Sequence, residues 1–183
     1  MDNSVKDIVQ LGSLAVASIG GIIAAFRAIL EMDRNRKQRI KELRWQQARE
    51  AKKLTDELYT NHYSRDAIRM LDLGGRQYKI TENLQQIITT EDVLNGLRIS
   101  NLTFSPKEIF IRDCFNEFLD ILEDIWIFIS VDLITFEDTK PIVDYYVKIM
   151  AENITVYKSF MKEYKFHNAL ALFERFDSWK RRL

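Results

Sequence analysis

The sequence predicts an all-α protein with a single N-terminal transmembrane helix that continues into a helical stalk, followed by a cytoplasmic helical bundle. Three observations support this prediction. Residues 8–26 carry no charge over nineteen positions. The rest of the chain has apolar residues at helical spacing among good helix formers. Six glycines and two prolines in 183 residues are too few for a turn-rich all-β fold.

These patterns divide the chain into four parts. The predicted boundaries are 1–7 for a short external tail, 8–30 for the transmembrane helix, 31–59 for a basic helical stalk and 60–183 for the bundle. A helix rises ~1.5 Å per residue, so the uncharged run can just cross a hydrocarbon core of ~30 Å. The positive region of a cleaved signal peptide is missing from residues 1–7, which favours a retained anchor.

The orientation of this helix follows from the basic residues behind it. They are Arg34, Arg36, Lys37, Arg39, Lys41 and Arg44. Positively charged residues favour the cytoplasmic side, so we expect an inner-membrane protein of a bacterium, with its N-terminus outside and its C-terminal domain in the cytoplasm. The same residues can hold anionic lipid headgroups, which makes membrane lipid an expected partner.

One side of the uncharged run carries small or polar residues at spacings of three and four. This seam consists of Gln10, Ser13, Ala17, Gly20, Ala24 and Arg27. Small residues at such spacing let helix backbones approach closely, so the seam predicts a homo-oligomer. A more specific hypothesis is a pore in which three or more copies surround a polar path. This path is lined by Gln10, Ser13 and the Gly20 backbone, with Arg27 at its cytoplasmic mouth. Alternatively, Arg27 extends to the cytoplasmic headgroups.

Behind the membrane segment the expected elements follow in order. Residues 27–59 contain neither proline nor glycine and predict a continuous helix. The next elements are a helix over 64–73 capped by Ser64, an extended piece over 76–80, and short helices over 81–88 and 90–97.

The clearest helix start is the sequence Ser105-Pro106-Lys107-Glu108, which has the residues of a capping box with proline at the first helical position. The helix that follows, to about residue 131, has a wide apolar face that includes Cys114 and is the predicted centre of the core. A turn over 136–140, a helix from Pro141 to about 164, and a last helix capped by Asn168 complete the chain.

The opposite face of the 106–131 helix carries a row of carboxylates. These are Asp113, Glu117, Asp120 and Asp124. A di-iron site would need Glu-x-x-His pairs, and neither histidine fits that pattern. A solvated face is the simplest interpretation, and docking onto a basic helix of a neighbouring copy is the functional alternative.

Charge and motifs limit the function classes. The formal net charge is zero, but residues 31–53 carry +5 and residues 112–144 carry −7, which favours self-association over nucleic acid as a partner. No nucleophile elbow, phosphate loop or Cys/His metal array occurs. We therefore predict no catalytic, cofactor-binding or metal-ligating residue, no cofactor and no enzyme. The single cysteine, Cys114, excludes an internal disulfide and is expected to be buried.

Part of the chain resembles a known family. The segments that carry the resemblance are Ile111-Arg112-Asp113-Cys114-Phe115-Asn116 and Phe136-Glu137-Asp138 with Pro141 and Tyr145-Tyr146. They are similar to a widespread bacterial domain of unknown function that usually follows one N-terminal membrane helix. The resemblance covers about residues 57–176 and implies an all-helical cytoplasmic domain without catalytic residues. The layout is also similar to membrane effectors of anti-phage defence, which oligomerise and breach the inner membrane.

These expectations lead to three functional hypotheses. The first is a homo-oligomeric inner-membrane protein whose cytoplasmic domain senses a ligand or a protein regulator and controls the membrane helices, for example as a channel-like effector in anti-phage defence. The second is a passive membrane-tethered scaffold or binding module. The third is a membrane-bound enzyme without a recognisable motif.

Overall fold

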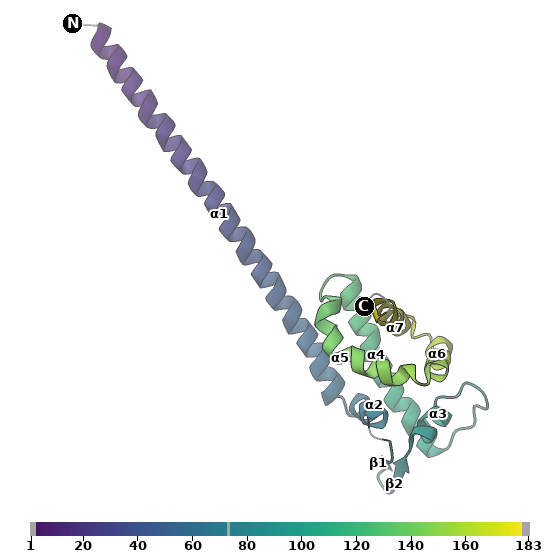
Figure 1. Cartoon of the computed structure of the whole chain (residues 1–183). Coiled ribbons are helices and arrows are strands. Elements are labelled where there is room, and N and C mark those ends of the chain that lie inside the picture. Colours follow the sequence, from purple (N-terminus) through teal and green to yellow (C-terminus); the bar gives the residue numbers. More distant parts are fainter. Residues whose placement is uncertain (1–2, 73, 181–183) are drawn as a thin grey trace. The chain divides into compact units, whose positions relative to one another are not determined.

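The computed structural model describes the backbone of residues 3–72 and 74–180, and the side chains of residues 26–72, 74–141 and 143–176. Within these residues the chain is mostly helical, with one two-stranded hairpin (Figure 1). The elements are α1 (Asn3–Thr60), α2 (His62–Asp72), β1 (Arg76–Thr81), β2 (Leu84–Ile88), α3 (Thr90–Gly96), α4 (Pro106–Ser130), α5 (Phe136–Ala151), α6 (Ile154–Glu163) and α7 (His167–Lys180). The predicted all-α class is confirmed at this coarse level.

The chain divides into two compact units, residues 1–45 and 46–183. The first unit is helical from residue 3, and every side chain described in it, from residue 26 to residue 45, is exposed. Among the described residues, no helix is both long and apolar enough to cross a membrane. Residues 8–25 of the predicted transmembrane helix lie outside the described side chains.

The second unit includes the last turns of α1. Ala51, Leu54 and Leu58 are buried there and belong to the hydrophobic core. The helix predicted over residues 27–59 therefore packs against the core at its C-terminal end. The second unit begins at Gln46, whereas the predicted bundle begins at residue 60.

Helix α4 lies at the centre of the second unit and packs against α2, α3 and α7. Ser105 caps it as predicted: its side chain accepts a hydrogen bond from the Glu108 backbone, and the Glu108 side chain accepts one from the Ser105 backbone. The apolar face of α4 is buried, and Cys114 and Phe115 have no exposed surface. The prediction that this helix forms the core is confirmed.

The helix predicted over 81–88 is wrong, because residues 84–88 form the strand β2. It pairs antiparallel with β1, with Arg76 opposite Ile88 and a two-residue connection at 82–83. Gly75 turns the chain into β1 with a φ of +88°, which glycine adopts without strain. The hairpin buries Tyr78 and Ile88 against the core, and this tertiary packing overrides the helix propensity of the glutamines in β2.

The turn predicted over 136–140 is also wrong, because α5 starts at Phe136. Thr135 caps this helix in a second capping box with Asp138, and Pro141 lies inside the helix instead of starting it. The predicted continuous helix to residue 164 ends at Ala151, and α6 resumes at Ile154. Tyr146 and Tyr157, on the two shorter helices, contact Phe118 and Phe115 of α4 with ring centroids 6.1 and 5.9 Å apart.

Two predicted caps are replaced by other side chains. Asn61, not Ser64, caps α2, since its Oδ1 accepts a hydrogen bond from the Ser64 backbone N–H at 3.1 Å. At the start of α7, Glu123 Oε1 accepts from the Ala169 backbone N–H at 2.7 Å, while Asn168 donates its side-chain amide to Glu123. Tertiary contacts with α4 supply this second cap, which a local sequence pattern could not reveal.

Candidate functional site

A polar pocket of about 250 Å³ lies between α2 and β1 in the second unit. It is lined by His62, Arg65, Asp66, Arg69 and residues 76–79. Helix α2 supplies the first four at spacings of three and four, which place them on neighbouring turns of one side. Strand β1 supplies the rest, and Figure 1 shows the hairpin and α3 beside the N-terminal end of α4.

Asp66 is the buried carboxylate of this pocket and is only 6% exposed. Its Oδ1 accepts a hydrogen bond from Arg69 Nη1 at 3.3 Å, and its Oδ2 lies 3.7 Å from His62 Nδ1. Asp66 therefore orients the exposed Arg69 and His62 side chains at the edge of the pocket. Such pairing offsets the desolvation of a carboxylate in a low-dielectric environment.

Tyr78 is the buried residue of β1, at 6% exposure, and its ring packs 6.3 Å from that of Phe110. Burial and, second, the Asp66 carboxylate raise the pKa of Tyr78 from its ordinary value of 10.0 to about 12. Neither the Tyr78 hydroxyl nor the Arg65 Nε has a hydrogen-bond partner among the described residues, although both atoms are buried.

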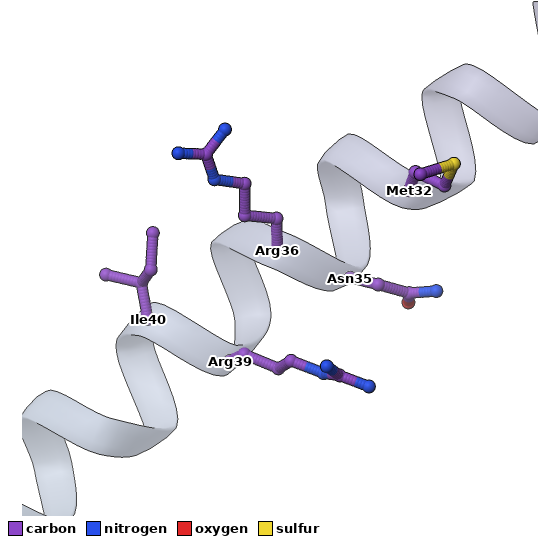
Figure 2. Close-up of a pocket in the computed structure, with 5 residues that line it drawn as sticks. All are labelled: Met32, Asn35, Arg36, Arg39 and Ile40. Carbon is purple, nitrogen blue, oxygen red and sulfur yellow. The ribbon is translucent and has the colours of Figure 1, made fainter.

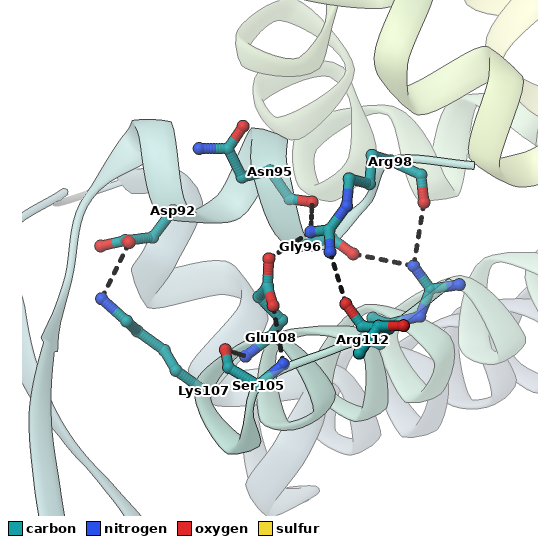
Figure 3. Close-up of polar contacts among 9 residues, drawn as sticks. Asp92, Asn95, Gly96, Arg98, Ser105, Lys107, Glu108 and Arg112 are labelled. Atoms are coloured by element: carbon teal, nitrogen blue, oxygen red, sulfur yellow. Dashed lines mark hydrogen bonds and ion pairs between the residues drawn. The ribbon is translucent and has the colours of Figure 1, made fainter. Parts of the chain in front are cut away.

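A second polar cluster surrounds Arg112 of α4 and is shown in Figure 3. The Arg112 guanidinium is buried and donates to the carbonyls of Gly96 and Arg98 at 2.8 and 3.2 Å, and to the Tyr164 hydroxyl. It also lies 4.1 Å from the centre of the Phe104 ring. These contacts tie the connection after α3 to α4 and α6, and they indicate a structural role.

Arg98 extends this cluster toward the start of α4. It donates to the carbonyls of Asn95 and Thr103 at 2.7 and 2.8 Å and pairs with Glu108 (Figure 3). The hydrogen bond from the Ser105 backbone, and next that from Arg98, lower the pKa of Glu108. The capping box is thus coupled to an ion pair that closes the α3–α4 connection.

The predicted acidic row lies along α4. Asp113, Asp120 and Asp124 are exposed, whereas Glu117 is partly buried and accepts a hydrogen bond from Asn61 Nδ2 at 3.0 Å. Burial, followed by the neighbouring carboxylates, raises the pKa of Asp120. Among the described residues, no group of three or more His, Cys, Asp or Glu side chains is placed to hold a metal ion.

The basic residues predicted to follow the membrane segment are exposed on α1 in the first unit: Arg34, Arg36, Lys37, Arg39, Lys41 and Arg44. Arg36 and Arg39 line a shallow hollow with Met32, Asn35 and Ile40. Figure 2 shows that these side chains all project from one helix, with Arg36 and Ile40 on one side and Asn35 and Arg39 on another. The hollow is therefore an open helix face that mixes apolar and basic groups.

The predicted seam falls mostly beyond the described side chains. Of its members only Arg27 is described, and it is exposed. Gln10, Ser13, Ala17, Gly20 and Ala24 lie on the helical backbone of α1, outside the residues with described side chains. The packing or pore role of the seam stays a prediction.

The pocket between α2 and β1 was not predicted from the sequence. Its signal was available in part, because Arg65 and Arg69 stand four residues apart on a helix and Arg76 and Tyr78 stand two apart on an extended segment. The partnership of these two groups depends on the hairpin, which was not predicted. Comparison of the chain with protein-family models, with curated proteins and with solved structures found no match.

Proposed function

We propose that this chain is a membrane-anchored regulatory protein of the bacterial inner membrane. Residues 8–30 span the membrane and self-associate, and the helical unit senses a ligand or a protein regulator and controls the associated membrane helices. The observation that carries this proposal is the uncharged run 8–26, which is followed but not preceded by a cluster of basic residues.

Two structural features support this proposal. The second unit has its own hydrophobic core around α4, which makes it suitable as a separate binding module. It also carries a polar pocket with buried groups that the chain's described residues leave without partners. A module with its own core and a polar pocket fits a binding role better than that of a passive anchor.

A ligand can control the membrane helices only if it binds two states of the protein with different affinity. In the channel-like form of the proposal, one state opens a path along the seam and the other closes it. This form agrees with the polar residues Gln10 and Ser13 on the small-residue side of the helix. It also agrees with the layout of the anti-phage effectors.

The experiment that tests the regulatory proposal replaces residues 8–30 with an unrelated monomeric membrane helix. Cells that express the wild-type chain and the exchanged chain are compared with a membrane-potential dye, before and after phage infection. We expect depolarisation with the wild type after infection and none with the exchanged chain. If neither chain depolarises cells under any condition, the channel-like form is wrong.

The alternative is a passive scaffold that positions the helical unit at the membrane. It is favoured by the exposed apolar and basic face of α1, which can lie against lipid without any change of state. A scaffold predicts that the exchanged chain retains every partner bound by the wild type in a cross-linking experiment. Loss of those partners would instead support control through the membrane helices.

A further inference from the structure

The pocket between α2 and β1 contains hydrogen-bond donors that the fold does not use. The Tyr78 hydroxyl and the Arg65 Nε are buried and have no hydrogen-bond partner among the described residues. Buried polar groups are normally satisfied, because water is lost on burial and only a new hydrogen bond compensates for it. Two unsatisfied groups in the lining of one pocket indicate that a missing group completes it.

The missing group must be an acceptor. Arginine Nε–H can only donate, and the Tyr78 hydroxyl, protonated at neutral pH like that of any tyrosine, is also available as a donor. Asp66, the acidic residue of the lining, is already engaged by Arg69 and lies beside His62. A ligand group that only donates would leave the Arg65 Nε–H unsatisfied, because the arginine side chain has no acceptor.

The missing group must also be negative. Among the residues that line the pocket, Arg65, Arg69, Arg76 and Lys79 each carry a positive charge, against the one carboxylate of Asp66. Arg76 and Tyr78 share a face of β1, since side chains two apart on a strand point to the same side. The charges of Arg76 and Arg69 both act on the Tyr78 hydroxyl. An anion bound beside Tyr78 would therefore lie close to two guanidinium groups.

The size of the pocket limits the anion. Its volume of about 250 Å³ is below the ~300–1,000 Å³ typical of sites that enclose a whole drug-sized ligand. A phosphate group fits such a space and offers several acceptor oxygens, which arginine can bind in a bidentate manner. The walls are mainly polar, which disfavours an apolar ligand.

We propose that this pocket binds the phosphate group of a soluble small molecule, with Arg65, Arg76 and the Tyr78 hydroxyl as donors. Arg69 would then be shared between the phosphate and Asp66. Phosphate binding would identify the ligand that the helical unit senses. The role of the phosphate as a signal rests on the proposed function. Binding itself needs only the second unit.

Access to the pocket requires a small movement. The Tyr78 hydroxyl is covered by protein atoms, so at least one covering side chain must move before an oxygen can reach it. The Arg69 and His62 side chains line the pocket and are 46% and 63% exposed, which leaves them free to swing outward. An incoming anion attracts the positively charged Arg69 side chain.

Isothermal titration of the full chain in detergent, at constant ionic strength, tests the proposal. The probes are sodium phosphate, sodium pyrophosphate and ATP. We expect saturable binding of at least one probe. Tyr78→Phe removes only the hydroxyl and should raise the Kd about tenfold or more, as expected for one lost charge-assisted hydrogen bond. Its matched control is Tyr157→Phe, a buried tyrosine of α6 outside the pocket.

A second variant tests the contribution of a positive charge in the pocket. Arg76→Gln should weaken binding by a similar factor, whereas Arg36→Gln, on an exposed arginine of the first unit, should leave the Kd unchanged. Absence of saturable binding by all three probes would overturn the proposal. So would a Kd that stays within about twofold in both Tyr78→Phe and Arg76→Gln.

A separate experiment distinguishes a soluble phosphate from the phosphate of a lipid headgroup. The chain is reconstituted in nanodiscs of phosphatidylcholine, with and without phosphatidylglycerol, and titrated again. Binding that requires phosphatidylglycerol would overturn the assignment to a soluble ligand. A chain that binds a soluble probe but is monomeric in the membrane would keep the pocket and disprove the proposed function. An oligomeric chain that binds no probe would disprove phosphate binding in the pocket and leave the proposed function standing.

Discussion

At the scale of single residues, Arg112 is the clearest stabilising group. Arg112 is 8% exposed, and its guanidinium donates to two backbone carbonyls and one hydroxyl and lies 4.1 and 5.0 Å from the centres of the Phe104 and Phe160 rings. An arginine can meet these partners together because its donors are arranged in a rigid fork. Lysine, with a point charge, cannot reproduce the arrangement.

We expect Arg112→Met to destabilise the second unit by about 2–4 kcal/mol, because the carbonyls of Gly96 and Arg98 lose their donors inside the protein. Urea titration of the full chain, followed by tryptophan fluorescence, measures the loss. Arg36→Met, on an exposed arginine of α1, provides the control and should change stability by less than about 0.5 kcal/mol. Equal effects of the two substitutions would show that Arg112 does not hold the α3–α4 connection.

At the scale of elements, the capping box before α4 gives a local prediction. Ser105→Ala removes the acceptor for the Glu108 backbone N–H and should lower stability by about 1 kcal/mol. The loss should appear as faster hydrogen exchange in the first turn of α4. Ser130→Ala, at the other end of the same helix, leaves that turn intact and is the matched control. Unchanged exchange in the first turn of Ser105→Ala would contradict this account of the helix start.

The acidic row on α4 predicts an unusual pH dependence. Burial and the carboxylates of Glu117 and Asp124 raise the pKa of Asp120 above its ordinary value of 3.8. The folded state therefore holds the Asp120 proton more tightly than the unfolded state, so ionised Asp120 destabilises the fold above the raised pKa. This penalty decreases as the pH falls and disappears below pH 3.8.

Asp120→Asn should consequently stabilise the protein at neutral pH and have no such effect below pH 3.8. Urea titrations across this pH range measure the difference. Added salt should reduce the part due to the neighbouring carboxylates, because exposed charges are screened. Asp113→Asn, at the exposed start of the same row, controls for the change in helix charge. A stabilisation that does not vary with pH would contradict the assignment to Asp120 ionisation.

The elements that could be predicted from the sequence are those with local signals. Helix α4 was predicted because Ser105, Pro106 and Glu108 stand at its start and its apolar positions repeat over twenty-five residues. The hairpin was missed because β2 contains helix-forming residues and is held as a strand by its pairing with β1. The start of α5 was missed because Pro141 was taken as its first residue, although Thr135 and Asp138 form the capping box.

The candidate site could not be predicted for the same reason. Tyr78 appears in the sequence as an ordinary residue of a short extended piece. Its role depends on two facts that only packing provides: its burial against Phe110 and the position of its hydroxyl among the charges of α2. The spacing of the basic residues could be read from the sequence. The lack of a hydrogen-bond acceptor for the buried Tyr78 hydroxyl could not. Orphaned donors are a property of the folded chain.

At the scale of the whole molecule, the proposed function depends on the predicted membrane segment and on its predicted self-association. The net charge is zero, yet residues 31–53 and 112–144 carry opposite excess charge. Opposite blocks on one chain favour contact between copies at low ionic strength. The proposed association through residues 8–30 would, by contrast, depend on close packing of small residues and should not be weakened by salt.

The seam predicts how substitutions in the membrane helix act on association. Gly20→Leu places a large side chain in the seam and should separate the copies, since close backbone approach is lost. Ala15→Leu makes a comparable small-to-large change on the side expected to face lipid. It should leave association intact. Both variants should still enter the membrane, because leucine favours insertion.

The measurement that tests the central claim most directly is the native mass of the full chain extracted from bacterial membranes in detergent. One copy has a mass of 21.7 kDa. A membrane-anchored oligomer predicts a defined multiple of this mass for the wild type and Ala15→Leu, and a single copy for Gly20→Leu. Wild-type chain recovered as one copy, or absent from the membrane fraction, would contradict the claim.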